Sequence, residues 1–335
     1  MRQKVKTFLC YLTIIVLLPY IVTVFINGPS IVSSPHVDGS YVKVRTESGE
    51  AGMSLEEYCI GILAKEIPAD YEKEALKAQA ILVRTEVYGK LQAGGEDLAL
   101  DRDFWTKDQM EEAWGAVKAA SNYGKFKDAW KETEGQVVTY EGNLARTSFF
   151  RLSNGSTRDG KEVLGQEDCP YIKIVDCPLD IEAQEQIQTV TVDDIDAEIT
   201  ATDTVGYVLS VRVGNEVVSG EEFRTNYHLS SSCFTFQRYE GKLRITTRGV
   251  GHGLGMSQYT ANEMAKEGED AASILGYFFV GTELKEVAEI VRNEAGAETD
   301  AENGEYAEEK TEPETDVEEG GNTEEKMDEK AEESE

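Results

Sequence analysis

The sequence predicts a mixed α+β fold in which a helical segment packs on a mostly antiparallel sheet, after an N-terminal transmembrane helix. Three observations predict it. Helical patterns come first, strand patterns follow, and two short helical patterns close the folded part, an order typical of α+β proteins rather than of a regular βαβ array. Apolar residues make up 40% of the 335 residues, enough for a sizeable core. An uncharged apolar stretch lies near the start of the chain.

That stretch, Phe8–Ile26, follows three basic residues and predicts that residues 1–27 are a cytoplasmic stub and a transmembrane anchor. About 20 apolar residues span a bilayer as a helix, and the basic side stays in the cytoplasm. A cleaved signal peptide is the alternative, although its apolar core is usually shorter. With a retained anchor, the protein is a single-pass protein of the cytoplasmic membrane whose remaining residues lie outside the cytoplasm.

The regions on either side of the predicted folded unit have biased compositions. Residues 28–40 are rich in Gly, Pro and Ser and predict a tether. Residues 291–335 hold 19 acidic and 4 basic residues with few large apolar side chains, so we expect a disordered acidic tail. The tail is either a spacer beside an anionic wall or simply a solvated end. The folded domain is therefore expected at 41–290.

The net charge of −31 excludes one class of partner. A nucleic-acid binder needs a basic surface that replaces the counterions of the phosphates, and this chain has the opposite balance. We therefore expect no nucleic-acid partner.

Two consecutive helices are predicted around a sharp corner. Ser54 followed by Glu57 is a capping-box pattern, and the helix that it begins should end near Glu66, because Pro68 disfavours the helical state in the residue before it. Asp70 should then cap a second helix over residues 71–91. Strand patterns occupy residues 41–45, 137–140, 189–192 and 207–213, and short helices are expected over 257–267 and 271–279.

Glu66 lies at that corner among Ile62, Leu63 and Ile67. An apolar environment disfavours the charged form of a carboxyl group, which allows it to act as a general acid near neutral pH. A glutamate at a helix end that simply faces water is the alternative reading.

Glycine occupies every second position from Gly249 to Gly255, with His252 between them. In an extended chain the glycines share one bare face, which a ligand or another backbone can approach closely. Ser257 should cap the following helix, whose start could hydrogen-bond a polar ligand. A tight packing joint with a structural histidine is the alternative, and no phosphate-binding fingerprint is present.

The cysteines and histidines predict neither a metal site nor a cofactor. The three histidines are scattered, and no CxxC or HExxH motif occurs. Cys169 and Cys177 are close enough in sequence to close a short loop by a disulfide, with free buried thiols or a zinc site as alternatives.

Several segments together resemble the stage II sporulation protein D family of peptidoglycan lytic transglycosylases. They are LEEYCIGILAKEIP, EALKAQAILVRT, SFFRLSNGSTR, EVLG with PYI, LSSSCF, and GHGLGMSQYTANEMAKEG with ILGYFFVGTEL, in the family's order. The resemblance covers about residues 41–286. It implies cleavage of the MurNAc–GlcNAc bond in peptidoglycan strands stripped of stem peptides, with an anhydro-MurNAc product, during septal remodelling and engulfment in sporulation.

The same resemblance implies roles for individual residues. Glu66 matches the family's catalytic acid, and one carboxylate suffices because the C6 hydroxyl of the substrate attacks C1. We expect the groove to be shaped by residues of the matching motifs: Arg84, His252, Ser257, Gln258 and Tyr259. Relatives often carry a histidine, sometimes a zinc ligand, where this chain has Arg151. No metal is therefore expected, and Arg151 with Ser153 of the following loop should bind substrate.

Two other functions are compatible with the sequence. Relatives of this family also modify wall amidases, so the domain could bind glycan and recruit or stimulate a cell-wall amidase without cutting. A purely structural anchor in the septal wall is the third reading. The implied location of all three is the space between the septal membranes.

Overall fold

The computed structural model describes residues 41–47, 49–94, 98–165 and 169–288. The predicted anchor (1–27), tether (28–40) and acidic tail (291–335) lie outside these residues. Within the described ranges, no helix is both long and apolar enough to cross a membrane. All of the described residues belong to one compact unit, and the account below concerns that unit.

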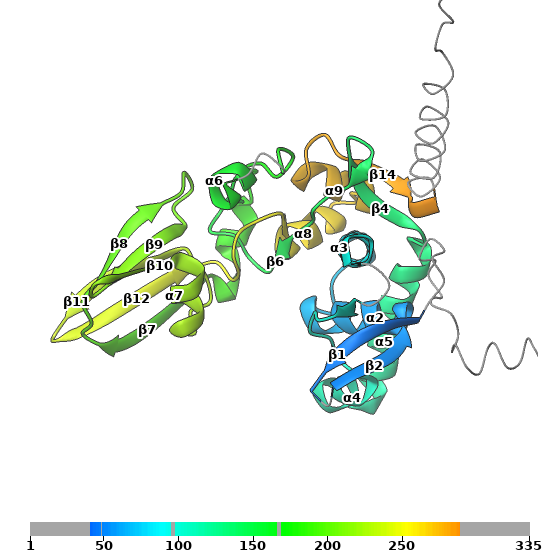
Figure 1. Ribbon diagram of the computed structural model, residues 1–335, viewed down its shortest axis with the longest axis horizontal. Helices are drawn as coiled ribbons and strands as arrows, with labels where there is room; N and C mark the ends of the chain where they lie inside the picture. Colours follow the sequence, from blue (N-terminus) through cyan, green and yellow to red (C-terminus); the bar gives the residue numbers. More distant parts are fainter. Residues whose placement is uncertain (1–40, 48, 95–97, 166–168, 289–335) are drawn as a thin grey trace, which may run out of the picture. The chain divides into compact units, whose positions relative to one another are not determined.

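The described residues form a mixed α+β fold, as predicted (Figure 1). Most strand pairs are antiparallel, but the strands form five small sheets rather than one. The sheet orders are β2-β1-β3, β10-β9-β8, β11-β12-β7, β13-β6 and β14-β4-β5. The strands are β1 (Tyr41–Thr46), β2 (Gly49–Ser54), β3 (Ala99–Leu100), β4 (Gln136–Tyr140), β5 (Asn143–Leu144), β6 (Phe149–Phe150), β7 (Ile187–Asp193), β8 (Ala197–Thr202), β9 (Val208–Val213), β10 (Glu216–Ser219), β11 (Phe234–Tyr239), β12 (Lys242–Arg248), β13 (Met256–Ser257) and β14 (Glu283–Glu286).

Eight α-helices and two short 3-10 helices lie within the described residues. They are α2 (Leu55–Glu66), α3 (Lys73–Gly94), α4 (Lys107–Trp114), α5 (Ala116–Glu132), α6 (Gly160–Leu164), η1 (Pro178–Glu182), η2 (Gln184–Gln186), α7 (Gly220–Asn226), α8 (Gln258–Lys266) and α9 (Ala271–Phe278). Both closing helices therefore form where the sequence predicts them.

The predicted corner between the first two helices is present. The Ser54 side chain accepts a hydrogen bond from the Glu57 backbone N–H at 3.2 Å, which caps the start of α2. The helix ends at Glu66, and Ile67 is extended as expected before Pro68. The second helix begins at Lys73, two residues later than predicted. The backbone N–H of Glu72 donates to the Asn262 side chain, so a contact distant in sequence fixes this helix start.

The larger hydrophobic core surrounds α3. This helix packs against α2, α5, α8, α9 and β4, and Figure 1 shows it nearly end-on among them. Its central residues are fully buried, which explains why its sequence is apolar on almost every side. The fold thus places α8 next to the α2–α3 corner, although nearly 200 residues separate them in sequence.

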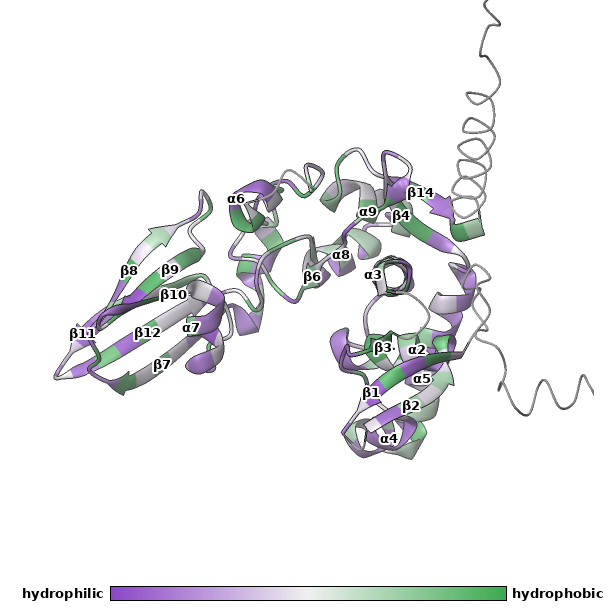
Figure 2. Ribbon diagram, in the orientation of Figure 1, coloured by the Kyte–Doolittle hydropathy of each residue, from purple (hydrophilic) through white to green (hydrophobic). Residues whose placement is uncertain are grey.

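A second hydrophobic core lies among β7–β12 and α7. Phe223, Phe234, Val211 and Ile245 are buried in it. β7 and β12 carry alternating hydrophobic and hydrophilic residues, visible as alternating colours in Figure 2. One face of β12 is therefore buried and the matching face of β7 is half-buried, while their other faces are exposed.

Candidate functional site

Glu66 is the last residue of α2, and its carboxylate pairs with Arg102. Glu66 Oε1 lies 3.3 Å from Arg102 Nη2, and the Glu66 side chain is 32% exposed. A second carboxylate, that of Glu86 on α3, pairs with Arg102 Nη1. The environment of Glu66 thus differs from the apolar one that the sequence predicts: its apolar neighbours face the core, and its carboxylate faces a guanidinium.

Arg102 is fixed in place by its own surroundings. Its backbone N–H and carbonyl both pair with the Tyr58 hydroxyl at 3.1 Å, and its guanidinium lies 4.8 Å from the centre of the Phe149 ring. Burial lowers the pKa of Arg102, but the hydrogen bond and charge of Glu86 outweigh burial and raise it above its usual value. Arg102 therefore stays charged between its two acidic partners.

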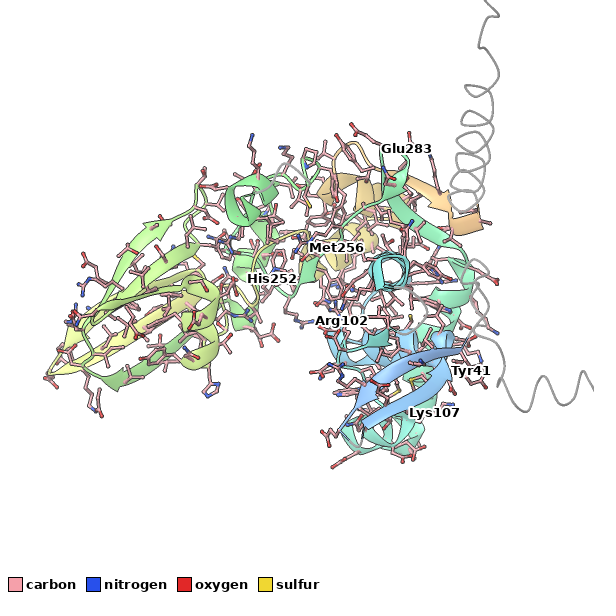
Figure 3. The ribbon with its side chains drawn as sticks, in the orientation of Figure 1. Tyr41, Arg102, Lys107, His252, Met256 and Glu283 are labelled. Atoms are coloured by element: carbon pink, nitrogen blue, oxygen red, sulfur yellow. The ribbon has the colours of Figure 1, made fainter. Side chains whose placement is uncertain are left out.

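Arg102 and Glu86 line a pocket of about 560 Å³. Figure 3 labels Arg102, which follows β3, and His252, which belongs to the glycine segment and lines the same pocket. Glu66 is not a lining residue, but its ion pair with Arg102 places it at the pocket's edge. The remaining lining residues come from α3, the segment 144–149, and single positions elsewhere: Thr85, Gly89, Lys90, Ala93, Leu144, Ala145, Arg146, Thr147, Ser148, Phe149, Leu164, Ile172 and Leu254.

His252 is neutral near pH 7 in this environment. Burial lowers the pKa of His252 to about 4, opposed by the charge of Glu221 and assisted by nearby arginines. Nδ1 accepts a hydrogen bond from the Leu254 backbone N–H at 3.1 Å, which leaves Nε2 as the protonated nitrogen. His252 is therefore available as a hydrogen-bond donor rather than as a cation.

Gln258 hydrogen-bonds the backbone of Glu66. Its Nε2 donates to the Glu66 backbone carbonyl at 3.0 Å and to Gln79 Oε1 at 3.1 Å, and its side chain is buried. A carbonyl at a helix C-terminus has no partner within the helix, so this bond fixes the end of α2. The sequence predicts that Gln258 binds substrate, whereas its position in the structure makes it a positioning residue.

Ser153 and Ser257 surround a buried carboxylate instead of lining a groove. Asp180 Oδ2 accepts from the Ser153 backbone N–H at 2.6 Å and from Ser257 Oγ at 2.7 Å, and Oδ1 accepts from Thr260 Oγ1 at 2.6 Å. Both serines are fully buried, and their predicted contact with substrate stays a prediction. Burial raises the pKa of Asp180, while these hydrogen bonds oppose the rise. Ser257 does cap α8, as predicted.

Arg84 is also structural. It is 1% exposed, stacks 3.7 Å from the centre of the Trp130 ring, and donates to the Trp130 carbonyl at 2.9 Å. Arg84 is thus packed in the α3–α5 interface and does not line the pocket beside Arg102, and its predicted contact with substrate stays a prediction.

Arg151 and Tyr259 are partly exposed and close to each other through the backbone. The Tyr259 N–H donates to the Arg151 carbonyl at 3.2 Å. The Arg151 guanidinium lies 3.6 Å from Glu185 and over the Tyr71 ring. Neither residue lines the pocket beside Arg102, and their predicted contact with substrate stays a prediction.

The glycine segment is a packing joint. All four glycines from 249 to 255 have positive φ, so the segment is not the regular extended strand that the alternation suggests. A Cβ at Gly251 would lie 2.7 Å from the Phe150 Cβ, and one at Gly255 would overlap the Ser148 carbonyl. The bare positions are thus filled by the segment around β6 and, beside Gly253, by Tyr207 and Arg158, and the alternative reading of this motif is the one that the structure supports.

The four cysteines of the described residues are free thiols. Cys169 lies 3.8 Å from the Tyr171 hydroxyl, and Cys177 lies near the Val175 carbonyl, so each packs in its own environment and the predicted bridge is absent. Burial, reinforced by the charge of Asp180, raises the pKa of Cys177 to about 12. Among the described residues, no group of three His, Cys, Asp or Glu side chains is arranged to hold a metal ion.

Sequence reasoning missed Arg102, Glu86 and Asp180. Arg102 and Asp180 lie in loops or short turns with no motif around them, and Glu86 is one of several charged residues on α3. One feature of the sequence could have indicated Glu86: it lies in a helical turn whose other residues are buried. An acidic side chain in such a place usually has a charged partner.

Arg102, which pairs with Glu66, and His252 of the glycine segment line the same pocket of this α+β fold. A family model described as stage II sporulation protein matches residues 49–140, which include that corner. The chain belongs to the stage II sporulation protein D family. It is 32% identical to the stage II sporulation protein D of Bacillus amyloliquefaciens over 257 residues, which cover 69% of this chain and 74% of the relative.

Two further relatives extend the comparison. The stage II sporulation protein D of Bacillus subtilis is 31% identical over 69% of this chain and 74% of its own. An amidase enhancer of the same species is 24% identical over 67% of this chain and 40% of its own. The chain is therefore similar both to proteins named for sporulation and to a protein named as an amidase enhancer.

Proposed function

We propose that this protein is a lytic transglycosylase that cleaves the MurNAc–GlcNAc bond of peptide-free peptidoglycan strands during sporulation. The observation that carries the proposal is the position of Glu66. It is a partly exposed carboxylate at a helix end, held by a guanidinium at the edge of a pocket of about 560 Å³. A pocket of this size is within the usual range for ligand sites.

The proposed reaction needs one acid that acts twice. Protonated Glu66 gives its proton to the glycosidic oxygen as the bond from C1 to that oxygen breaks. The carboxylate then accepts the proton of the C6 hydroxyl, whose oxygen forms a bond to C1. The product is 1,6-anhydro-MurNAc, no water is consumed, and Glu66 regains its starting proton.

Glu86 is the carboxylate that a hydrolytic mechanism would need as its second acidic group. Glycosidases normally use two carboxyl groups, one of which activates water or attacks the sugar. Glu86 lines the pocket, but its oxygens are engaged by Arg102 and, at 3.5 Å, by Lys90. We propose that Glu86 holds Arg102 in place and does not activate water.

Replacing Glu66 by Gln tests the proposal, because the amide keeps the shape of the side chain and cannot supply the proton. We expect the full-length E66Q protein to cleave peptide-free strands at least about 100-fold more slowly than the wild type, the lower end of a general acid's contribution. Mass spectrometry of the products measures both the rate and the chain ends.

Glu57→Gln is the matched control, since Glu57 lies on the same helix and pairs with Lys107 on the surface. It should cleave like the wild type. Undiminished cleavage by E66Q would reject Glu66 as the acid, and reducing MurNAc ends would reject transglycosylation even if Glu66 proved essential.

A non-catalytic role is the second candidate, and the similarity to an amidase enhancer favours it. In this case the domain binds glycan and recruits or stimulates a cell-wall amidase. E66Q separates the two functions: a modifier retains its full effect on an amidase after this change, whereas a transglycosylase loses its product. An amidase is a proposed partner in both cases.

Either function requires the domain to meet the wall outside the cytoplasm. We propose that the anchor predicted at residues 1–27 keeps the protein in the cytoplasmic membrane, with the domain in the space between the septal membranes. Fractionation of sporulating cells, with protease added to intact protoplasts, tests both parts of this proposal.

A further inference from the structure

We propose that the pocket beside Glu66 binds the free lactyl carboxylate of a muramyl residue, and that Arg102 and Arg146 are the residues that recognise it. The inference rests on the proposed function for the identity of the glycan. It goes beyond that function by assigning the selection of peptide-free strands to two named cations, neither of which belongs to the motifs that the sequence points to.

Arg102 keeps one donor unused. Its Nη1 pairs with Glu86 and its Nη2 with Glu66, while its buried Nε has no hydrogen-bond partner among the described residues. Leaving a buried charged donor without a partner is unfavourable, so such atoms indicate a missing ligand or water. Because the pocket is bounded by this side chain, an acceptor in the pocket is the natural partner.

Arg146 supplies a positive charge that no acidic side chain of the described residues neutralises. It lies on the segment between β5 and β6, lines the pocket and is exposed. Its backbone N–H donates to the Tyr171 hydroxyl, but within the described ranges its guanidinium has no acidic partner. Lys90, the other lysine or arginine of the pocket wall, is already engaged by Glu86 and Asp101. In a chain with a net charge of −31, an unpaired arginine facing a pocket favours an anionic ligand.

The remainder of the wall suits an acetamido sugar. Apolar side chains at Leu144, Phe149 and Leu254 line part of it, and hydroxyl groups at Thr147 and Ser148 line another part. A muramyl residue offers an acetyl methyl group, a C6 hydroxyl and one carboxylate, which match these three kinds of surface. In an intact strand the stem peptide converts that carboxylate to an amide, which removes the charge and adds bulk.

The experiment measures binding, so that it remains informative whether or not the protein cuts. The full-length E66Q protein is titrated with two preparations of peptide-free strands. One has free lactyl carboxylates, and the other has had them converted to primary amides. The same titrations are repeated after adding Arg146→Gln, with Lys242→Gln as a control, since Lys242 is an exposed lysine on β12 that does not line this pocket.

We expect the carboxylate strands to bind about tenfold more tightly than the amidated strands, the preference that one charge-assisted contact supplies. Arg146→Gln should remove most of this preference, and Lys242→Gln should keep it. Arg102→Lys, which retains the charge but loses the Nε donor, should reduce it as well.

Equal binding of the two preparations would overturn the inference, and so would an equal loss of both in Arg146→Gln. Neither result would test the proposal that Glu66 is the catalytic acid, because the assay measures binding only. In turn, cleavage by E66Q would overturn the proposed reaction without changing the binding preference.

Discussion

Two carboxylates near the start of α8 have opposite surroundings. Asp180 is fully buried and accepts hydrogen bonds from two hydroxyl groups and one backbone N–H, with no cation in contact. Glu66 is partly exposed and is held by one guanidinium at the edge of a pocket. Asp180, surrounded by neutral donors, joins segments of the fold, whereas Glu66 is partly exposed and pairs with a guanidinium that its own surroundings fix. The comparison sets a structural acid beside the proposed catalytic acid, although both lie in the same part of the molecule.

The largest effect is expected from breaking the structural acid. Asp180→Ala leaves two hydroxyl groups and one N–H without their acceptor in a dry site, so the free energy of unfolding should fall by about 3 kcal/mol. Chemical denaturation of the full-length protein measures it. Asp180→Asn keeps one acceptor and should cost less. A loss of less than about 1 kcal/mol in Asp180→Ala would mean that water replaces the carboxylate and that the cluster does not hold the fold together.

A smaller effect is expected from the link to Glu66. Gln258→Leu removes the donor to the Glu66 carbonyl, which frees the end of α2. We expect kcat for strand cleavage to fall about tenfold with KM unchanged, because misplacing a reacting group slows the chemical step.

Gln79→Leu is the control for this change. It breaks the Gln258–Gln79 bond but keeps the bond to Glu66, so any general loosening of the α3–α8 contact appears in both variants. Similar kcat values in the two variants would show that Gln258 has only a packing role.

The third prediction concerns pH. The pKa of His252 is about 4 in the folded protein and about 6.5 in an unfolded chain, so between these values only the unfolded chain takes up the proton. The stabilising contribution of neutral His252 is therefore complete above pH 6.5 and is lost as the pH falls toward 4.

Because His252 lies at a pocket wall and is only partly buried, we expect a loss of about 1 kcal/mol over this range. The charged groups that act on it are Glu221, Arg224, Arg158 and Arg102. Denaturation curves at pH 5 and pH 7 for the wild type and for His252→Gln measure the difference. A pH dependence that is unchanged in the variant would assign the effect to other groups.

The smallest effect is expected from the thiols. Because Cys169 and Cys177 are free in the structure, a reducing agent should leave the denaturation midpoint unchanged, and both thiols should react with an alkylating agent after unfolding. Non-reducing peptide mapping gives the same answer directly. A peptide pair that separates only after reduction would show that oxidation joins them.

Local rules predicted the parts of the fold that depend on neighbours in sequence. Ser54 caps α2 and Pro68 ends it because each acts within four residues, and Ser257 caps α8 for the same reason. The start of α3 was misplaced because its first N–H groups are held by Asn262, which no local pattern reveals.

In the candidate site, too, local patterns predicted some residues and missed those that only the tertiary fold brings together. Glu66 was predicted from its corner and from the family resemblance. Its partner Arg102 lies 36 residues further along the chain and reaches it only through the tertiary fold. Arg84 and the two serines belong to the predicted motifs but are fully buried in the structure, and no local pattern reveals that burial.

The four positive-φ glycines have a consequence for protein engineering. Each of these glycines has a backbone conformation that residues with a side chain rarely adopt. Inserting or deleting one residue in the segment 249–255 would therefore move a larger residue into a position where only glycine fits. A mutant library across this segment should therefore fix its length and its glycines and vary only the residues between them. Of these, Val250 and His252 are partly exposed and offer the most room for change.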